Sequence, residues 1–593
     1  MNQQAQTQRG FLPVSIEKEN LQNSDTVQFD VIFVTGDPYY DHPLSGIAIL
    51  SRLLELKGYS VGIVAEPQSK EDYLRCGRAK YLFCITSGLL DSSLANYTPM
   101  LRERENVMVP VHAPIVYTSK IKEYFKGSMT VIGGVEATTR RFTHFDYKEN
   151  KLRRGVLNDS KADLLIHGNA ERALLDLLSR IKKLTAEDSF TKFKEIQEKL
   201  NLATIDALSY RVKANELPEG VRKLPSFEAC AADSSKFSLL TRIHYLLPNS
   251  EFIEPCGSGF IKHNRPSHPL SEKEMDLIYD LPFTRKLHPN SKLFDYHQSM
   301  VDFLENSVVI GRGCWGSCNF CVIPLVQGKE VAKRSTESIL LEIERLYKSG
   351  VKKINDLTLP TLNMYGSYCS LYEDEQKMSS AIIEEEITVL NKTKYCNQKC
   401  AGCPKRVLRD DLYPLLEGVE KLQEKYAGTT LELRSAIRHD VILNQKKLFR
   451  KIMQFTSRLK IAPEHISNKV LAQMNKGTRA DFEEFLKEFN LVNKEQGTKK
   501  RLVPYFVAGH PGSTISDMEI LSKFCDEKNI YVNLTQVFTP TPGTASTAAY
   551  YSGKDTFTKE DVYVARGFRE KKDQKNILVL KENNDLAEKD DLG

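Results

Sequence analysis

Three closely spaced cysteines are the most specific chemical feature of this sequence. Cys314, Cys318 and Cys321 lie in the stretch Gly-Arg-Gly-Cys-Trp-Gly-Ser-Cys-Asn-Phe-Cys, residues 311–321. Three thiolates at this spacing on one loop can bind three corners of a cubane iron–sulfur cluster and leave its fourth iron open. A structural zinc site normally takes four ligands, and this loop offers three. The spacing therefore favours a 4Fe-4S cluster with an iron that is free for chemistry.

A second group of cysteines has the same spacing, at Cys396, Cys400 and Cys403, with Cys369 upstream. It falls in the insert 364–427, which is too long for an ordinary connection between a strand and a helix. The group does not follow a predicted strand, and Gly402 stands where an aromatic residue precedes Cys321. Four cysteines can complete either an iron–sulfur cluster or a tetrahedral zinc site.

The chain that must position these groups is long and nearly balanced in charge. Its 593 residues predict roughly three or four structural units, which excludes a small binding module. The 41% hydrophobic and 27% charged residues match a globular protein, and twelve cysteines are too few for a disulfide scaffold. The net charge of +6 permits a nucleic-acid partner without indicating one. No apolar run reaches the roughly 18 residues of a spanning helix and no signal peptide is visible, so we expect a cytoplasmic protein without a membrane partner.

The overall pattern predicts an α/β protein. Residues 27–183 alternate short apolar runs with amphipathic stretches, which predicts a parallel sheet covered by helices, a Rossmann-like unit. Its expected strands end in glycine, at the edge where open α/β sheets bind ligands. They are residues 29–35, 59–64, 81–86, 129–132 and 162–167, with helices at 46–57 and 171–183.

The remainder divides into three parts. Residues 184–300 are expected to be a connector with a hairpin at 208–225. Residues 301–555 contain six expected strands separated by helical segments, which suggests a partial (β/α)6 barrel of the TIM type. These strands are residues 307–310, 352–355, 431–437, 458–461, 502–507 and 532–538. Residues 556–593 mix both charge signs and are expected to be a solvated helix or a frayed tail.

The cysteine loop and its position after the first barrel strand resemble the radical S-adenosylmethionine (SAM) enzymes. In that family the open iron is chelated by the amino and carboxylate groups of SAM, and the equivalent of Phe320 lies beside the adenine. Residues 460–465, 506–512 and 537–544 resemble the later barrel strands of the radical SAM branch that includes methylthiotransferases and cobalamin-dependent methylases. Residues 34–43, 132–137, 159–163 and 435–440 resemble the YgiQ family of radical SAM proteins, which has a cobalamin-binding-like Rossmann domain before the barrel.

The resemblance implies where SAM would be held, although the sequence departs from the pattern. Where such enzymes often have Gly-Gly-Glu after the second strand, this chain has Asp356, which is able to accept hydrogen bonds from the SAM ammonium. Ser435 and Arg438 are able to meet the ribose and the SAM carboxylate, or to make ordinary salt bridges and turns. Glu464, at the end of the fourth strand, is either a SAM or substrate contact or a cap.

The cofactor of the N-terminal domain does not follow from its fold. Cobalt ligation in that family uses Asp-x-His-x-x-Gly, whereas here Asp41 and His42 are adjacent. We therefore expect no ligation by His42 and do not expect cobalamin as a cofactor, with unligated binding left open. A group of polar residues forms either a substrate wall or ordinary turns and solvated faces: Asp37, Asp41, His42, Glu136, Arg140 and Arg141.

The resemblance implies an enzyme that cleaves SAM reductively at its cluster to start radical chemistry on an unidentified substrate. A flavodoxin or ferredoxin would supply the electron. An enzyme that works by reduction needs electron carriers, so we expect the second cysteine group to bind an auxiliary iron–sulfur cluster in preference to zinc. Cys369 would be its fourth ligand. The alternatives are RNA methylthiolation or methylation, and a non-catalytic iron–sulfur electron-transfer or regulatory protein.

Overall fold

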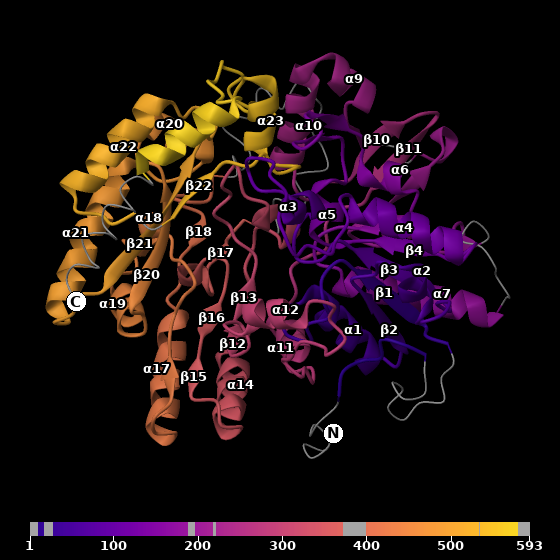
Figure 1. Ribbon diagram of the computed structural model, residues 1–593, viewed down its shortest axis with the longest axis horizontal. Helices are drawn as coiled ribbons and strands as arrows, with labels where there is room; N and C mark the ends of the chain where they lie inside the picture. Colours follow the sequence, from indigo (N-terminus) through magenta and orange to yellow (C-terminus); the bar gives the residue numbers. More distant parts are fainter. Residues whose placement is uncertain are drawn as a thin grey trace.

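The computed structural model describes residues 10–16, 28–187, 196–217, 221–371, 399–532 and 534–578. Figure 1 shows two units side by side, an N-terminal unit built on a sheet and a C-terminal unit of strands with helices on their outer side. The α/β class and the parallel strands predicted from the sequence are confirmed. No described helix is both long enough and apolar enough to cross a membrane.

The N-terminal unit is a nine-stranded sheet in the order β2-β1-β3-β4-β7-β8-β11-β10-β9. Alternate residues of its strands face opposite helical layers, as the period of two requires. Phe33 of β1 packs in a cluster with Leu174 of α7, whereas the next residue, Val34, packs in a cluster with Tyr117 of α4. The parallel part comprises β1 (Val31–Thr35), β2 (Val61–Ala65), β3 (Leu82–Thr86), β4 (Thr130–Ile132) and β7 (Leu164–Ile166). The covering helices named here are α1 (Gly46–Leu56), α4 (Ala113–Tyr124), α5 (Gly134–Thr139) and α7 (Glu171–Glu187).

The segment expected to be a connector extends this sheet instead. β8 (Leu208–Val212) pairs antiparallel with β7 and with β11 (Gly259–His263), and β10 (Phe252–Cys256) pairs with β9 (Arg222–Lys223). The hairpin expected at 208–225 is therefore wrong, because β8 pairs with a strand some fifty residues later and not with β9. Local turn signals do not reveal pairing over that distance. The helix α10 (Ser234–Leu246) lies between these strands in the chain.

Parallel strands form a curved series in the C-terminal unit. β12 pairs with β16, β15 with β19, a bridge joins Ile437 to Ile461 of β20, and β20, β21 and β22 form one sheet. Their bounds are β12 (Ser307–Val309), β15 (Lys353–Ile354), β16 (Asp356–Thr358), β19 (Thr430–Leu431), β20 (Arg458–Glu464), β21 (Arg501–Ala508) and β22 (Leu534–Val537). The helices outside them include α14 (Thr336–Lys348), α17 (Leu412–Lys425), α19 (Lys446–Gln454), α21 (Arg479–Glu495) and α22 (Ile515–Glu527). One apolar cluster, which includes Val308, Leu415 and Phe485, fills the space between strands and helices.

The described end of the chain is not the solvated tail expected from its charges. Residues 568–578 are helical, and Lys571, Gln574 and Leu578 are fully buried. Gln574 accepts a hydrogen bond from Gly509 N, and Lys571 Nζ lies 3.0 Å from the hydroxyls of Tyr147 and Tyr550. Because Tyr147 belongs to the N-terminal unit, this helix joins the two units. The mixed charges of this segment did not predict that role, because the buried Lys571 contacts phenol oxygens and aromatic rings instead of carboxylates.

Candidate functional site: a cysteine loop at the ends of the C-terminal strands

The three cysteines Cys314, Cys318 and Cys321 lie on the loop between β13 (Gly311–Arg312) and α13 (Ile323–Val326). The loop begins with a tight turn at Gly313, whose φ is 94°. A Cβ atom there would stand 2.1 Å from the carbonyl oxygen of Glu330, so only glycine fits. The turn brings the cysteine loop back over the ends of the strands.

Backbone contacts from two other segments fix the loop. Asn319 N donates to Met474 O at 3.0 Å, and Asn475 Nδ2 donates to Ser317 O at 2.8 Å, both from the end of α20 (Asn468–Met474). Ser546 N, in α23 (Ala545–Ser552), donates to Asn319 O at 2.9 Å. The loop is thus held before any ligand binds.

The thiols and their surroundings fit a cluster better than a single zinc ion. Burial raises the pKa of Cys314, and that of Cys321 to about 12, so a bound metal is what would deprotonate them. Among the described residues the three sulfurs do not all lie within 4.8 Å of one another, whereas tetrahedral zinc holds its sulfurs about 3.8 Å apart. Trp315 Nε1 and Ser317 Oγ are buried without a hydrogen-bond partner in the described structure, beside the position a cluster would take.

Arg438 provides a buried positive charge at the loop. Its Nη1 lies 3.1 Å from Gly316 O and 3.7 Å from Cys318 Sγ. Asp440 holds the other side of the guanidinium, with Oδ1 2.9 Å from Nε and Oδ2 2.8 Å from Nη2. We expected Arg438 either to meet a SAM carboxylate or to make an ordinary salt bridge. In the structure it makes a salt bridge with Asp440 and contacts the cysteine loop.

Lys476 is a second buried cation that was not among the residues predicted for the site. Its Nζ donates to Ala462 O at 2.9 Å, lies 3.3 Å from Glu464 Oε1 and stands 5.9 Å from the centre of the Phe320 ring. Glu464 ends β20 with φ of 66°, a strained conformation for glutamate that concentrates at functional sites. Lys476 escaped notice because it follows a turn after α20 and not a strand.

Asp356 and Ser435 meet each other at neighbouring strand ends. Asp356 Oδ1 accepts from the backbone nitrogens of Arg434 and Ser435, and Oδ2 accepts from Ser435 Oγ at 2.6 Å. One lone pair of Oδ2 remains for a further donor. Phe320 makes an edge contact with His510 at 6.0 Å between ring centres. Of the five proposed SAM contacts, Phe320 lies on the cysteine loop, Arg438 contacts it, and Glu464 is linked to it through Lys476. Asp356 and Ser435 form a separate pair, with Asp356 at the first residue of β16, opposite Ser307.

The second cysteine group lies against the first. β17 (Tyr368–Cys369) pairs with β18 (Arg406–Val407), which places Cys369 opposite Arg406. Cys400 packs in the same small cluster as Trp315 and Cys314. Arg406 lies over the Trp315 ring at 5.0 Å and is paired with Glu330, which also accepts from Cys369 N. Cys396 lies outside the described residues.

The polar residues proposed for the N-terminal unit do not form one wall. Asp41 pairs with Arg52 at 2.5 Å, Glu136 accepts from Ser92 N, and Arg140 is held by Asp91 and Asp146. Arg141 lies over the Phe142 ring and beside His167. Glu136 and Arg140 adjoin each other, with Glu136 Oε1 4.0 Å from Arg140 Nε, whereas Asp41 and Arg141 make other buried contacts. Asp37 alone of the six lines the cavity between the units.

The N-terminal half of the chain matches a family described as "Radical SAM N-terminal" over residues 11–301, and residues 533–587 match "Domain of unknown function (DUF3362)". This match, with the cysteine loop, makes the protein an enzyme of the radical SAM class. A UPF0313 protein of Geobacter sulfurreducens is 35% identical to it, over 96% of this chain and 92% of the relative. The chain belongs to the UPF0313 family.

Solved structures with a similar fold include two cobalamin enzymes. One is a radical SAM methyltransferase, TsrM, from Kitasatospora setae with cobalamin and a 4Fe-4S cluster bound, with a TM-score of 0.49 and 13% identity over 86% of this chain and 73% of that one. The other is the cobalamin-dependent radical enzyme OxsB with aqua-cobalamin bound, with a TM-score of 0.44 and 11% identity over 84% of this chain and 52% of that one. The expectation against cobalamin was therefore wrong: a missing Asp-x-His-x-x-Gly pattern is not a ground for excluding it.

Proposed function

We propose that Cys314, Cys318 and Cys321 hold the SAM-binding 4Fe-4S cluster of this enzyme. The observation that carries the proposal is the pre-formed loop at the strand ends, with Arg438 and Lys476 beside it. When bound, such a cluster supplies the electron that cleaves SAM to methionine and a 5′-deoxyadenosyl radical, which takes a hydrogen atom from the substrate. The buried cations would stabilise the negative charge of three thiolates, a role that salt bridges on the surface do not have.

The chain's own residues would bind and orient SAM. Oδ2 of Asp356 would accept a hydrogen bond from the ammonium, and Ser435, which donates to Asp356, would meet the ribose. The edge of Phe320 would face the adenine. Glu464, held by Lys476, would complete the polar side of the site. Holding SAM at fixed atoms is how such a site orients it for reaction.

We propose a finer description of the fold on the same basis. The parallel strands of the N-terminal unit would be a Rossmann-like, cobalamin-binding-like domain, and the six parallel strands of residues 301–555 a partial (β/α)6 barrel. Within the radical SAM class the motifs are those of the YgiQ family. A flavodoxin or ferredoxin would be the electron donor.

We propose that the second cysteine group holds an auxiliary iron–sulfur cluster on Cys369, Cys396, Cys400 and Cys403. Support comes from its position, because Cys400 and Cys314 contact one apolar cluster that contains Trp315. A cluster there would pass electrons to the first one. A structural zinc ion does not transfer electrons, so it would gain nothing from lying next to the first cluster, although its cysteine ligands would be the same.

The test is product formation by the full chain after anaerobic reconstitution with iron and sulfide. With dithionite as reductant, we expect 5′-deoxyadenosine and methionine in equal amounts from added SAM. Cys230→Ala, which changes a buried cysteine remote from both groups, is the matched control for Cys314→Ala and Cys321→Ala. Undiminished 5′-deoxyadenosine from either loop variant would refute the assignment.

A further inference from the structure

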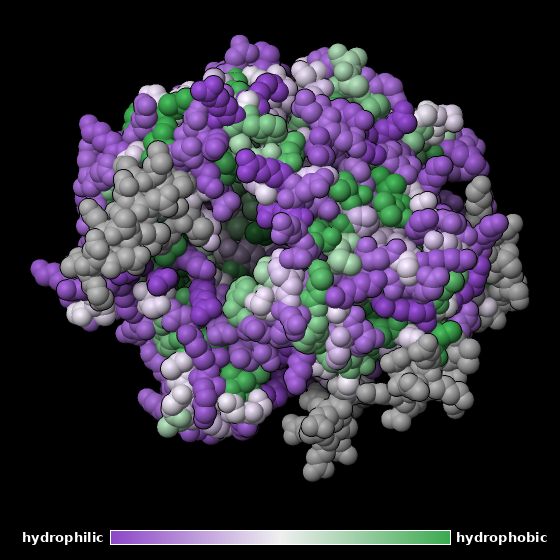
Figure 2. Space-filling model, in the orientation of Figure 1, coloured by the Kyte–Doolittle hydropathy of each residue, from purple (hydrophilic) through white to green (hydrophobic). Residues whose placement is uncertain are grey.

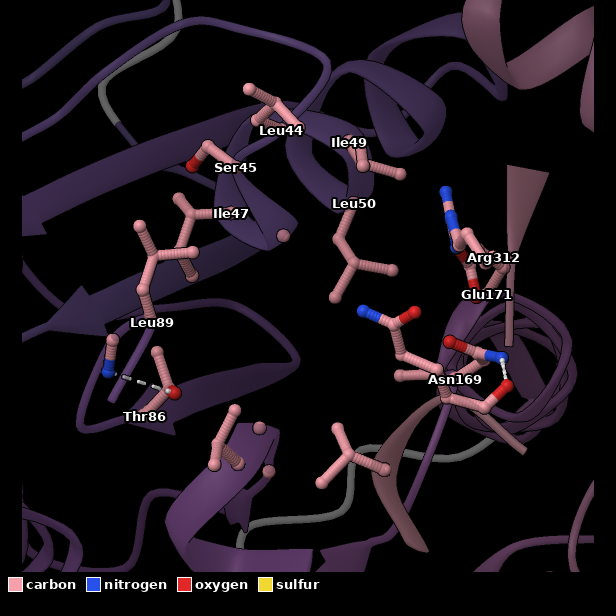
Figure 3. Close-up of a pocket in the computed structure, with 18 of the residues that line it drawn as sticks. Leu44, Ser45, Ile47, Ile49, Leu50, Thr86, Leu89, Asn169, Glu171 and Arg312 are labelled. Atoms are coloured by element: carbon pink, nitrogen blue, oxygen red, sulfur yellow. Dashed lines mark hydrogen bonds and ion pairs between the residues drawn. The ribbon is translucent and has the colours of Figure 1, made fainter. Parts of the chain in front are cut away.

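A cavity of about 410 Å³ lies between the two units. One side is formed by the carboxyl ends of β1, β3, β4 and β7, where ligands of open α/β sheets bind, and by the first turns of α1. The facing side comes from the C-terminal unit, with Val309 and Leu359 after its first strands and Arg312 just before the cysteine loop. In Figure 3 the labelled side chains surround an open space, with Asn169, Glu171 and Arg312 near one another at one end. Figure 2 also shows a hollow in the surface between the units.

The side of the cavity formed by the sheet is wide, and glycines at the strand ends leave backbone exposed on it. Four adjacent strands at about 4.8 Å spacing span roughly 14 Å. Gly88, Gly133, Gly134 and Gly168 lie at these strand ends and line the cavity. A Cβ atom at Gly134 would stand 2.4 Å from Thr86 Oγ1, so the backbone itself forms the surface there. Such a side accommodates the face of a flat ligand.

The lining of the cavity has no cation that is free to bind a phosphate group, so phosphate is not the group that this cavity recognises. Most of the lining is aliphatic, with Leu44, Ile47 and Leu50 of the α1 region prominent in Figure 3. None of its lining residues is a lysine, and Arg312 is already paired with Glu171. Burial raises the pKa of Asp37 to about 6, so a carboxylate and not a cation stands at the strand ends at neutral pH. A nucleotide cofactor would find no free positive charge.

Two buried polar atoms at one end of the cavity indicate which polar groups the edge of the ligand carries. Glu171 Oε2 and Arg312 Nη2 are buried and have no hydrogen-bond partner in the described structure. A carboxylate oxygen accepts and a guanidinium nitrogen donates, so the pair matches the NH₂ and C=O of a primary amide. Asn169 lies beside them, with its Nδ2 3.2 Å from Gln327 O.

We propose that this cavity binds a corrinoid, a flat macrocycle edged with primary amides, with one face against the strand ends and without an axial side-chain ligand from this chain. No histidine is among the lining residues of the described structure. His42 is held elsewhere, since its Nδ1 accepts from Leu44 N and its Nε2 lies 3.1 Å from Glu305 O. The aliphatic walls match the faces of the ring, and Glu171 and Arg312 match its amides. The binding proposal stands independently of the proposed SAM cluster.

The test uses hydroxocobalamin and the full-length chain, with bound corrinoid measured by visible absorbance after gel filtration. We expect about one corrinoid per chain and a spectrum without imidazole coordination. Leu50→Trp fills the cavity and should weaken binding at least ten-fold, which is about 1.4 kcal/mol. Leu56→Trp is the matched control, because Leu56 lies on the same helix but is 49% exposed. It should bind corrinoid as the wild type does.

Iron content and 5′-deoxyadenosine formation are measured on the same samples. They show that Leu50→Trp is folded and separate this proposal from the cluster assignment. Absence of corrinoid binding by wild-type protein that still cleaves SAM would overturn the proposal. Equal binding by Leu50→Trp and wild type, or bands of imidazole ligation that His42→Ala removes, would also overturn it.

Discussion

The two cysteine groups share one spacing but are held in different ways. The loop of Cys314, Cys318 and Cys321 is fixed by α20, α23 and the buried cation Arg438. The group of Cys369, Cys400 and Cys403 is held by the pairing of the short strands β17 and β18 and by Glu330. The two groups therefore differ in the contacts that surround them and not in their cysteine spacing.

The difference is also one of charge. The first group has Arg438 and Lys476 close by, each with a carboxylate, Asp440 and Glu464. The second has Arg406, which is paired with Glu330 and lies over Trp315. Trp315 is 1% exposed and belongs to the apolar cluster against which Cys314 and Cys400 both pack.

The largest effect should come from Cys318→Ala. A cubane held by two thiolates does not keep its open iron, so SAM cleavage should be abolished while the second centre keeps its metal. Iron analysis and the 5′-deoxyadenosine assay check this together. Cleavage that survives the substitution would mean that the second group, and not the first, binds SAM.

Cys400→Ser should remove the second centre and leave the first. If both groups hold 4Fe-4S clusters, the variant loses about half its iron and still responds to SAM. Cys256→Ser, in the N-terminal unit, is the matched control. Loss of zinc with all iron retained would assign a structural zinc site instead, and unchanged iron and zinc would show that the group binds neither.

Arg438→Gln should destabilise the protein by about 3–5 kcal/mol, because it leaves Asp440 as a buried charge without its partner. Urea unfolding measures this, with the exposed Arg458→Gln as control. The double variant with Asp440→Asn should recover most of the loss in stability but not the SAM cleavage. Full activity in the double variant would show that Arg438 serves the fold alone.

Glu330→Gln should have the smallest effect, about 1.5–3 kcal/mol. Arg406 loses its charged partner, but the amide oxygen still accepts one hydrogen bond from Arg406 or from Cys369 N. Metal retention should fall at the second group and stay unchanged at the first. Glu337→Gln, on the exposed face of α14, is the control. Equal metal loss at both groups would contradict the separate support described above.

Much of this arrangement could be read from the sequence. The parallel strands were predictable because buried strands between helices appear as short apolar runs, such as residues 31–35 and 82–86. The loop of Cys314 to Cys321 was identified because its ligands are local in sequence. Strand β8 was misassigned because its partner, β11, lies beyond any local signal.

The missed features depend on contacts between distant segments. Lys476 reaches Glu464 only through the turn after α20, and Trp315 meets Cys400 across the insert. The helix at 568–578 looks solvated by composition, yet Lys571 is buried among aromatic rings of both units. The cavity is likewise invisible in sequence, since its two sides come from different units.

The most direct test of the central claim is electron paramagnetic resonance of the reduced protein before and after SAM is added. The account predicts a signal that SAM changes, present in wild type and Cys400→Ser and absent in Cys318→Ala. A SAM-sensitive signal that survives in Cys318→Ala would contradict it, as would one that Cys400→Ser removes while iron at the first group remains.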